Sequence, residues 1–401
     1  MAQSRRPFTY QGVEVWRHTK VIQWTLQIVS GILVVALVAW FFTNIVNAVQ
    51  DREIPHGFGF LDRAYQTPIG HHFLPYESSD SYGYAVGVAV VNTLVVSIVG
   101  VILATALGIF VGVARLSSNW LVSKLATVYI EFFRNVPLLI QLFFWFYIVL
   151  ALPPVREGYA IGGGLYINNA AFSLPFPNAA GTAGAVVWSL LAAGALAAGY
   201  AAFRLLTARE LRTGQPSYPL YAGVATAVVI GAIAWIVVSF AAGDAPFFIS
   251  WPEPQGRFGR IAEGFTAPAA LVALLVGLVT YTASFIAEIV RAGIQSVRRG
   301  QIEASRALGL SPMETLRYVT FPQALRVIIP PLISQFLNLT KNSSLAGAIG
   351  YADLTAVAKT MTQLAPAVSI FLLIMAAYLA MSLTYSLIGN LYNRHIKFTG
   401  G

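Results

Sequence analysis

The stretch EASRALGLSPMETLRYVTFP, residues 303–322, lies between two long apolar runs and contains two short helix signals separated by a glycine. Residues 301–308 are good helix formers, and Gly309 follows them where a left-handed C-terminal cap is expected. The tetrapeptide SPME at 311–314 then supplies an N-cap serine, a proline at the first helical position and a capping-box glutamate. We therefore predict a helix, a glycine hinge and a second helix that runs to the end of the stretch.

The first predicted helix has a small apolar face and a polar face, and this favours docking into a groove of another protein. The alternative is a helix that lies on the lipid surface, which would carry bulky apolar residues opposite lysines. Because the apolar face is mostly alanine, we favour docking. The residues that we expect to dock are Glu303, Ala304, Ser305, Arg306, Ala307, Leu308 and Gly309.

The composition is that of a membrane protein. Hydrophobic residues make up 57% of the 401 positions, charged residues make up 10%, and the mean hydropathy is +0.69. A water-soluble domain has roughly a quarter charged residues. The net charge of +9 is spread over short loops, so no basic patch indicates nucleic acid. The chain has no cysteine, which excludes a disulfide framework and a thiolate metal site.

Eight apolar runs are long enough to cross a bilayer as helices. They are residues 21–46, 85–114, 125–150, 183–205, 219–241, 266–290, 326–349 and 366–391. The first is too long for a signal-peptide core, so we expect it to be retained. With the N-terminus in the cytoplasm, the inner segments carry 17 Lys and Arg and the outer segments carry six. This bias predicts that both termini are cytoplasmic, in an all-α polytopic membrane protein.

Polar side chains inside the predicted spans are candidates for function, because they are costly in a bilayer. Lys341 would balance a solute carboxylate, or it would pair with Glu131, Glu288 or Asp353. Buried amides and hydroxyls elsewhere would line a pore, or they would make interhelical hydrogen bonds worth about 0.6 kcal/mol each. The candidates for solute contact or pore lining are Asn92, Thr93, Gln141, Asn338, Lys341, Asn342, Ser343 and Ser344.

Two charged pairs are candidates for a structural or gating role. Glu131 and Arg134 are three positions apart, so we predict an ion pair on one helix face. Glu288 and Arg291 lie at the inner end of the sixth span and are expected to anchor the start of the polar loop. The G-x-x-x-G pair at 108–112 predicts close helix packing.

The opening stretch resembles the EAA loop of the membrane subunits of bacterial binding-protein-dependent ABC importers. The resemblance rests on Glu303-Ala304-Ser305, three residues, Gly309, nine residues, and Val319-Thr320-Phe321-Pro322. Ser305 stands where a third alanine is usual. The loop's flanks, EFFRNVPLLIQLFFWF at 131–146, YTASFIAEIVRAGIQSVRRG at 281–300 and LTKNSSLAGAIG at 339–350, resemble the polar amino acid permease branch.

Two departures from that branch concern the solute. Asn135-Val136 stands where Gly-Thr is usual, and Asn342-Ser343 stands where Asp-Thr is usual. The first span and the segment 151–265 are similar to the long permeases of general L-amino acid importers.

The resemblance implies a type I ABC importer core interrupted by an insertion. Residues 1–84 would hold the cytoplasmic N-terminus, the first span and a periplasmic loop, and 85–150 the first part of the core. Residues 151–265 would be the insertion with two extra spans. Residues 266–401 would complete the core and include the coupling loop 291–325.

The same resemblance implies the partners. They would be a cytosolic ABC ATPase dimer, a second homologous permease subunit, with a heterodimer favoured over a homodimer, and a periplasmic amino acid-binding protein. The chain has no G-x-x-x-x-G-K-[ST] loop, so we expect no cofactor in it and ATP with Mg in the ATPase. The chain itself would be non-catalytic, and residues 303–309 would be the coupling helix.

An ion-coupled secondary carrier that works alone is the alternative function. It predicts an inverted repeat with broken helices in matched halves, and the sequence shows neither. A membrane enzyme would need a catalytic cluster at one face, and none is evident.

Overall fold

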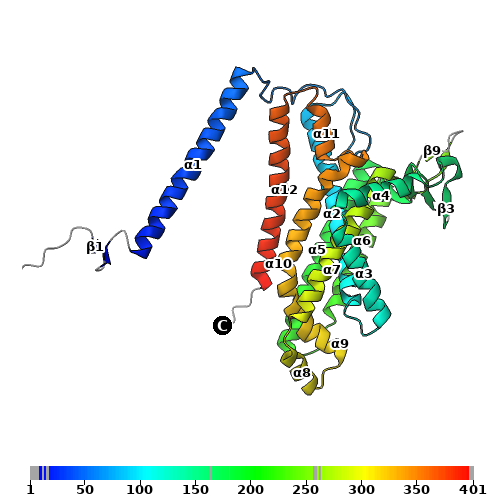
Figure 1. The fold of residues 1–401 in the computed structure, drawn as a ribbon. Helices are drawn as coiled ribbons and strands as arrows, with labels where there is room; N and C mark the ends of the chain where they lie inside the picture. Colours follow the sequence, from blue (N-terminus) through cyan, green and yellow to red (C-terminus); the bar gives the residue numbers. More distant parts are fainter. Residues whose placement is uncertain are drawn as a thin grey trace, which may run out of the picture.

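A computed structural model gives the fold (Figure 1), and it describes residues 9–10, 13–14, 18–162, 164–179, 181–255, 260–261 and 263–396. The predicted inner-side Arg5, Arg6, Arg17 and Lys397 and the outer-side Arg257 lie outside these residues. The long helices are α1 (Thr19–Asp51), α2 (Tyr82–Ala114), α5 (Thr182–Thr213), α6 (Pro219–Ala242), α7 (Ala269–Gln295), α10 (Phe321–Asn342) and α12 (Ala367–Ile396).

Shorter helices and turns connect or flank them. They are α3 (Trp120–Asn135), α4 (Leu138–Leu150), α8 (Arg299–Ala307), α9 (Pro312–Glu314) and α11 (Leu354–Met361), the 3-10 turns η2 (Val155–Glu157) and η4 (Ser343–Ile349), and the π-helical η3 (Thr315–Thr320). The strands are β1 (Thr9–Tyr10), β2 (Val13–Glu14), β3 (Tyr159–Ile161), β4 (Leu165–Ile167), β5 (Ala171–Leu174), β6 (Phe176–Ala179), β7 (Phe247–Ser250), β8 (Pro254–Gln255), β9 (Arg260–Ile261) and β10 (Phe265–Pro268).

A helix bundle centred on α2 and α7 forms the core. The two helices cross closely enough that a Cβ on Gly112 would lie 2.7 Å from the Ala287 carbonyl oxygen, and one on Gly108 would lie 2.6 Å from Ile286. The predicted close packing at 108–112 is therefore confirmed. Fully buried aliphatic side chains such as Leu274 and Leu278 of α7 fill the centre.

Six of the described helices are long and apolar enough to cross a membrane: α1, α2, α5, α6, α7 and α12. These match six of the eight predicted spans. The predicted span 125–150 is divided, because α3 and α4 meet at a bend of 108°, and the pair counts as a seventh candidate span only if it crosses as a broken helix. Pro137 lacks the N–H that would continue α3, and it pushes Val136 into an extended conformation.

The predicted span 326–349 also differs, because it divides into α10 and the 3-10 turn η4. Pro330 and Pro331 lie inside α10, and each removes a backbone donor from the helix. This segment is not one of the six apolar spans.

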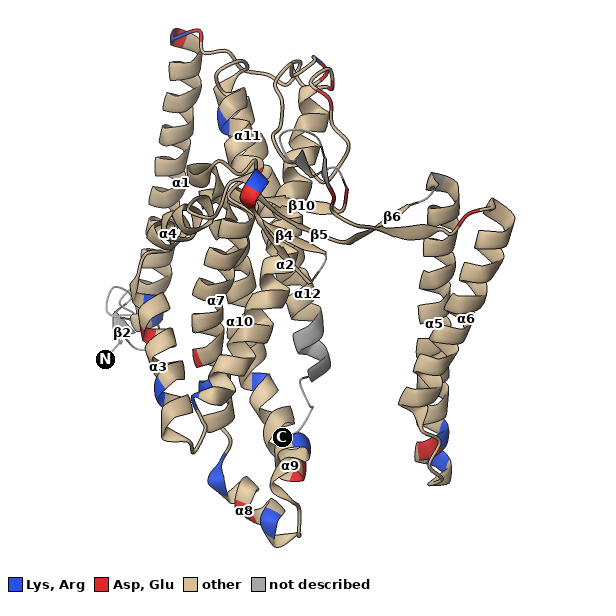
Figure 2. Ribbon diagram, turned by 90° about the vertical axis from the view of Figure 1, so that its right-hand side faces the viewer, with Lys and Arg blue, Asp and Glu red and all other residues tan. Residues whose placement is uncertain are grey.

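The segment 151–265, which we predict to be an insertion, contains short strands that an all-α prediction does not include. Strands β3, β4, β5 and β10 form an antiparallel sheet in the order β10-β5-β4-β3, and β10 runs directly into α7. A second ribbon pairs β6 with β7 and carries the α5–α6 hairpin. Figure 2 shows this hairpin standing beside the bundle.

The bundle has two distinct ends. Strands β3 to β10 and α11 lie toward one end, which we call the strand end, and α8 forms the tip of the other, which we call the α8 end (Figures 1 and 2). Helix α1 begins and α12 finishes toward the α8 end (Figure 1). Helix α1 has no buried residue, so the other residues that the structure describes do not cover it.

Candidate functional site

The segment between α7 and α10, residues 296–320, contains α8, and we call it the α8 loop. It has the local structure that the sequence predicts. Helix α8 ends at Ala307, and Gly309 follows in the left-handed region with a φ of +83°. Ser311 and Glu314 form a complete capping box, in which the Ser311 N–H donates to Glu314 at 2.8 Å. These hydrogen bonds lower the pKa of the Glu314 carboxyl. The hinge and the start of the second helix are therefore confirmed.

The second helix of the loop differs from a regular α-helix. Three residues of α9 pass into the π-helical η3, which continues without a break into α10. Insertions of this kind widen the helix locally and are frequent at functional sites. The loop is thus joined to α10 by a helical segment rather than by a flexible linker.

Ser305 is the one predicted docking residue of α8 that is buried, at 3% exposure. Its hydroxyl donates to the Ile302 carbonyl at 2.7 Å and lies 3.0 Å from the Thr315 hydroxyl. The serine that replaces the usual alanine therefore fastens α8 to η3 across the glycine hinge. The other predicted docking residues, Glu303, Ala304, Arg306, Ala307, Leu308 and Gly309, are exposed.

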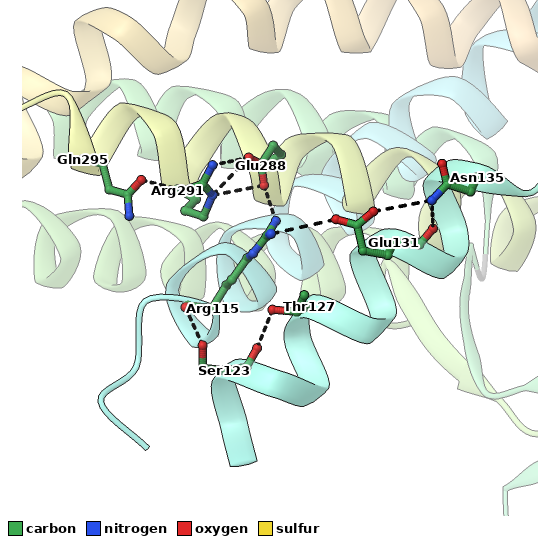
Figure 3. A network of polar contacts seen from close by, with 8 residues as sticks. All are labelled: Arg115, Ser123, Thr127, Glu131, Asn135, Glu288, Arg291 and Gln295. Carbon is green, nitrogen blue, oxygen red and sulfur yellow. Dashed lines mark hydrogen bonds and ion pairs between the residues drawn. The ribbon is translucent and has the colours of Figure 1, made fainter. Parts of the chain in front are cut away.

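An ionic cluster of Arg115, Glu288 and Arg291 lies at the base of this loop (Figure 3). Arg115, directly after α2, donates to Glu288 of α7. Arg291, one turn further along α7, holds the same carboxylate with its Nε at 3.0 and 3.1 Å and with a terminal nitrogen. The cluster therefore ties the end of α2 to the end of α7, just before α8.

Helix α3 joins this ionic cluster more loosely. Glu131 lies 3.9 Å from Arg115, and its side chain is 57% exposed. Ser123 donates to the Arg115 carbonyl at 2.9 Å. This hydrogen bond holds the turn between α2 and α3, from which the Arg115 side chain extends to Glu288 of α7 (Figure 3).

The predicted ion pair of Glu131 with Arg134 is wrong. Glu131 faces Arg115 and accepts a hydrogen bond from Asn135 at 3.4 Å, whereas the Arg134 guanidinium lies 5.1 Å from the centre of the Phe285 ring. Sequence reasoning does not single out Arg115, because it is one of the 17 Lys and Arg in the predicted inner segments. Its position directly after a long apolar run was the available signal.

Three polar residues predicted to line a pore are buried and have partners within the chain. Asn92 donates to the carbonyls of His71 and Ala352, and it accepts from the Phe73 N–H. The Thr93 hydroxyl accepts from the Leu354 N–H at 3.0 Å. These bonds fasten α2 to the segments that cross the strand end.

Gln141 has a similar structural position. Its amide donates to the carbonyls of Phe133 and Val136, both at 2.9 Å. Those carbonyls lie at the end of α3, where the break at Pro137 leaves them without helical donors. For Asn92, Thr93 and Gln141, the structure therefore matches the alternative of internal hydrogen bonds.

The segment 338–344 presents polar groups on the surface of the end of α10. Asn338 and Lys341 are exposed, and Asn342 and Ser344 are partly exposed. Ser343 is buried, and its hydroxyl donates a hydrogen bond to the Thr340 carbonyl at 2.7 Å. The expected acidic partners of Lys341 are engaged elsewhere, because Glu131 and Glu288 face arginines. Lys341 and Asn338 are one turn apart on an exposed face.

Asp353 caps α11 at the strand end and is fully buried. Its carboxylate accepts from the backbone N–H groups of Thr355 at 3.1 Å and Ala356 at 2.9 Å, and it lies 3.4 Å from the Tyr378 hydroxyl. Burial outweighs these bonds and raises the pKa of Asp353 to about 6. The deprotonated side chain is therefore less favourable in the folded protein than in the unfolded chain.

The stability of the fold should fall as pH rises from about 4 to about 6, because over that range the folded state holds a proton that the unfolded state has lost. Asp353→Asn keeps an N-cap side chain and removes the buried charge, so this part of the pH dependence should disappear. Thermal unfolding in detergent at several pH values measures it. The exposed Asp62→Asn is the control, and equal slopes for wild type and Asp353→Asn would contradict the assignment.

No group of three or more His, Cys, Asp or Glu side chains that could hold a metal ion occurs within the described part of the chain.

Known proteins have sequences that are similar to this chain. Residues 227–398 match the family model described as binding-protein-dependent transport system inner membrane component. The protein YhdX of Escherichia coli (strain K12) is 40% identical over 398 residues, which covers 98% of each chain. The general L-amino acid transport system permease protein AapQ of Rhizobium johnstonii is 39% identical, covering 92% of this chain and 90% of AapQ.

A third relative is the glutamate/glutamine/aspartate/asparagine transport system permease protein BztB of Rhodobacter capsulatus. It is 36% identical, and the match covers 93% of each chain. These alignments cover at least 92% of this chain and so include most of residues 151–265, which confirms the similarity to long permeases.

Proposed function

Because this chain belongs to the binding-protein-dependent transport system inner membrane components, as an amino-acid ABC transporter permease, we propose that α8 is its coupling helix. Through α8 a separate cytosolic ATPase would drive import of polar L-amino acids by alternating access. The chain is a transport component, and the hydrolysis of ATP belongs to the partner. The observation that carries the proposal is the exposed, firmly held α8 at the tip of the bundle.

The mechanical path from α8 into the membrane supports this role. Helix α8 is joined to α7 by three residues and to η3 by the bond between Ser305 and Thr315. The end of α7 is held to α2 by Arg115 and Glu288. A pull on α8 would therefore reach α7, α2 and α10 together, which is what a two-state bundle needs in order to switch.

The partners follow from the family. A dimer of cytosolic ABC ATPases would bind ATP and Mg, since this sequence holds no phosphate-binding loop. A second homologous permease subunit would complete the translocation path in a heterodimer, and a periplasmic amino acid-binding protein would deliver the solute at the strand end. The protein would span the bacterial inner membrane several times, with both termini in the cytoplasm.

The solute would be a polar L-amino acid. The relatives' names refer to general L-amino acids and to glutamate, glutamine, aspartate and asparagine. The exposed cation and amide of Lys341 and Asn338 would contact such a solute's carboxylate when the partner permease encloses that face of α10.

Charge reversal and strain in the loop test the coupling role. Glu303→Lys and Gly309→Asp should abolish recruitment of the ATPase and solute uptake, because Glu303 is exposed on α8 and Gly309 sets the hinge. The measurements are co-purification of the ATPase and uptake in proteoliposomes. Gly57→Asp is the matched control, since Gly57 also has a positive φ with open space around its Cβ, at the strand end. Recruitment and uptake that persist in both loop variants would refute the coupling helix.

A further inference from the structure

Helices α5 and α6 form a hairpin with a groove along their contact. The helices are closest at Gly199 and Gly223, since a Cβ on Gly199 would lie 2.6 Å from the Gly223 carbonyl oxygen. Glycines and mostly apolar side chains, among them Leu196, Leu220 and Val224, line a groove of about 290 Å³ at this contact. These three side chains are 68%, 63% and 56% exposed, so the other described residues of the chain leave the groove open.

The groove lies at the depth of lipid acyl chains. The apolar span of α5 begins at Ala183, and Arg204 is the first charged residue of this helix. At a rise of 1.5 Å per residue, the 21 steps between them cover about 32 Å, close to the roughly 30 Å hydrocarbon core of a bilayer. Arg204 therefore lies at the level of the headgroups, and the α5 residues of the groove, from Leu196 to Phe203, lie just inside it. The charged end of the hairpin points toward the α8 end (Figure 2).

A cation lies at the headgroup end of this groove. The Arg204 guanidinium lies 6.0 Å from the centre of the Tyr200 ring, and Tyr200 itself lines the groove. Arg204 is exposed and forms no ion pair with any residue that the structure describes. Tyrosine is enriched at the membrane–water interface. An arginine at the mouth of an apolar groove matches a molecule with an anionic head and a hydrocarbon tail.

We propose that this groove binds one anionic phospholipid, with an acyl chain in the groove and the phosphate on Arg204. The acyl chain contacts the apolar side chains, and the guanidinium donates charge-assisted hydrogen bonds to the phosphate oxygens. Basic pockets between membrane helices bind anionic headgroups in this way. The site is built from α5 and α6 alone, so the proposal does not depend on the coupling function of α8.

The charge balance at this end of the hairpin favours an anionic headgroup over a zwitterionic one. From Arg204 to Tyr218 the sequence holds three arginines and one acid, Glu210. Phosphatidylcholine would place its own cation beside these arginines, whereas phosphatidylglycerol has none. Free phosphate would use the arginine without the groove, so a variant that fills the groove separates the lipid from a free ion.

The test uses the full-length protein, delipidated in detergent and titrated with phosphatidylglycerol or phosphatidylcholine, and native mass spectrometry measures the bound lipid. Arg204→Gln should lower the affinity for phosphatidylglycerol at least tenfold, because hydrogen bonds to a charged group are lost. The preference for phosphatidylglycerol over phosphatidylcholine should disappear with it. Val224→Trp places an indole in the groove and should weaken the binding of both lipids.

Matched controls lie on the same two helices. Arg209 is also exposed, but it lies about two and a half turns from Tyr200 and so on the opposite face of α5. Val228 is 63% exposed on α6 and does not line the groove. Arg209→Gln and Val228→Trp should therefore bind both lipids as wild type does. Equal affinities for phosphatidylglycerol in Arg204→Gln and Arg209→Gln would overturn the headgroup contact, and wild-type binding by Val224→Trp would overturn the groove.

Discussion

Arg115→Gln is expected to lower solute uptake at least tenfold while ATP hydrolysis by the assembled transporter continues. In the folded protein, Arg115 is the link between α2 and the Glu288 carboxylate of α7. Hydrogen bonds to charged groups contribute about 1.5–3 kcal/mol each. Without that bond, only the packing of α2 on α7 would hold the ends of the two helices together. Movement of α8 would then carry the end of α2 less tightly, so less of the hydrolysis would be converted into transport.

The geometry supplies a matched comparison for this prediction. Glu131 also faces Arg115, but at 3.9 Å and with a side chain that is 57% exposed. Exposed pairs of this kind contribute about 0–1 kcal/mol, so Glu131→Gln should retain most of the uptake. The measurement is the ratio of solute transported to ATP hydrolysed in proteoliposomes. Equal ratios in wild type and Arg115→Gln, or equal losses in Arg115→Gln and Glu131→Gln, would contradict the role given to Arg115.

Features of the chain that depend on neighbouring residues could be predicted from the sequence. Gly309 and the SPME tetrapeptide fix the hinge and the second helix start through φ and two local hydrogen bonds. The six regular apolar spans follow from length and hydropathy alone. Pro137 is a local signal for a break at this point of the sequence, although the 108° direction of the turn depends on how α3 and α4 pack on α7.

Features that depend on distant residues could not be predicted in this way. Arg115 and Glu288 are 173 positions apart, and Asn92 and Ala352 are 260 apart. In the sequence, Asn92 is only a polar residue in an apolar run, and a pore lining and a structural bond are equally good explanations. Only the fold shows that the Ala352 carbonyl at the strand end accepts a hydrogen bond from Asn92. Ser305 likewise looks like a small departure from a motif until Thr315 is found beside it.

Gly112→Ala is expected to destabilise the bundle by about 3 kcal/mol, the upper part of the range for overpacking. The added Cβ would lie 2.7 Å from the Ala287 carbonyl oxygen and 3.0 Å from the Val290 Cβ. The carbonyl belongs to the backbone of α7, so a side-chain rotation cannot relieve the clash and the two helices must separate. Separation would also stretch the bond of Arg115 to Glu288 close to the same ends of α2 and α7, so uptake should fall together with stability.

Gly87→Ala provides the control within the same helix. Gly87 also lies in α2, but no atom is within 4 Å of the position of its Cβ. Alanine is a better helix former than glycine, so this variant should unfold at the wild-type temperature or above it. Thermal unfolding of both variants in detergent makes the comparison. If Gly112→Ala and Gly87→Ala unfold at the same temperature, α2 and α7 do not pack through Gly112, and the rigid connection from α8 to α2 loses its physical basis.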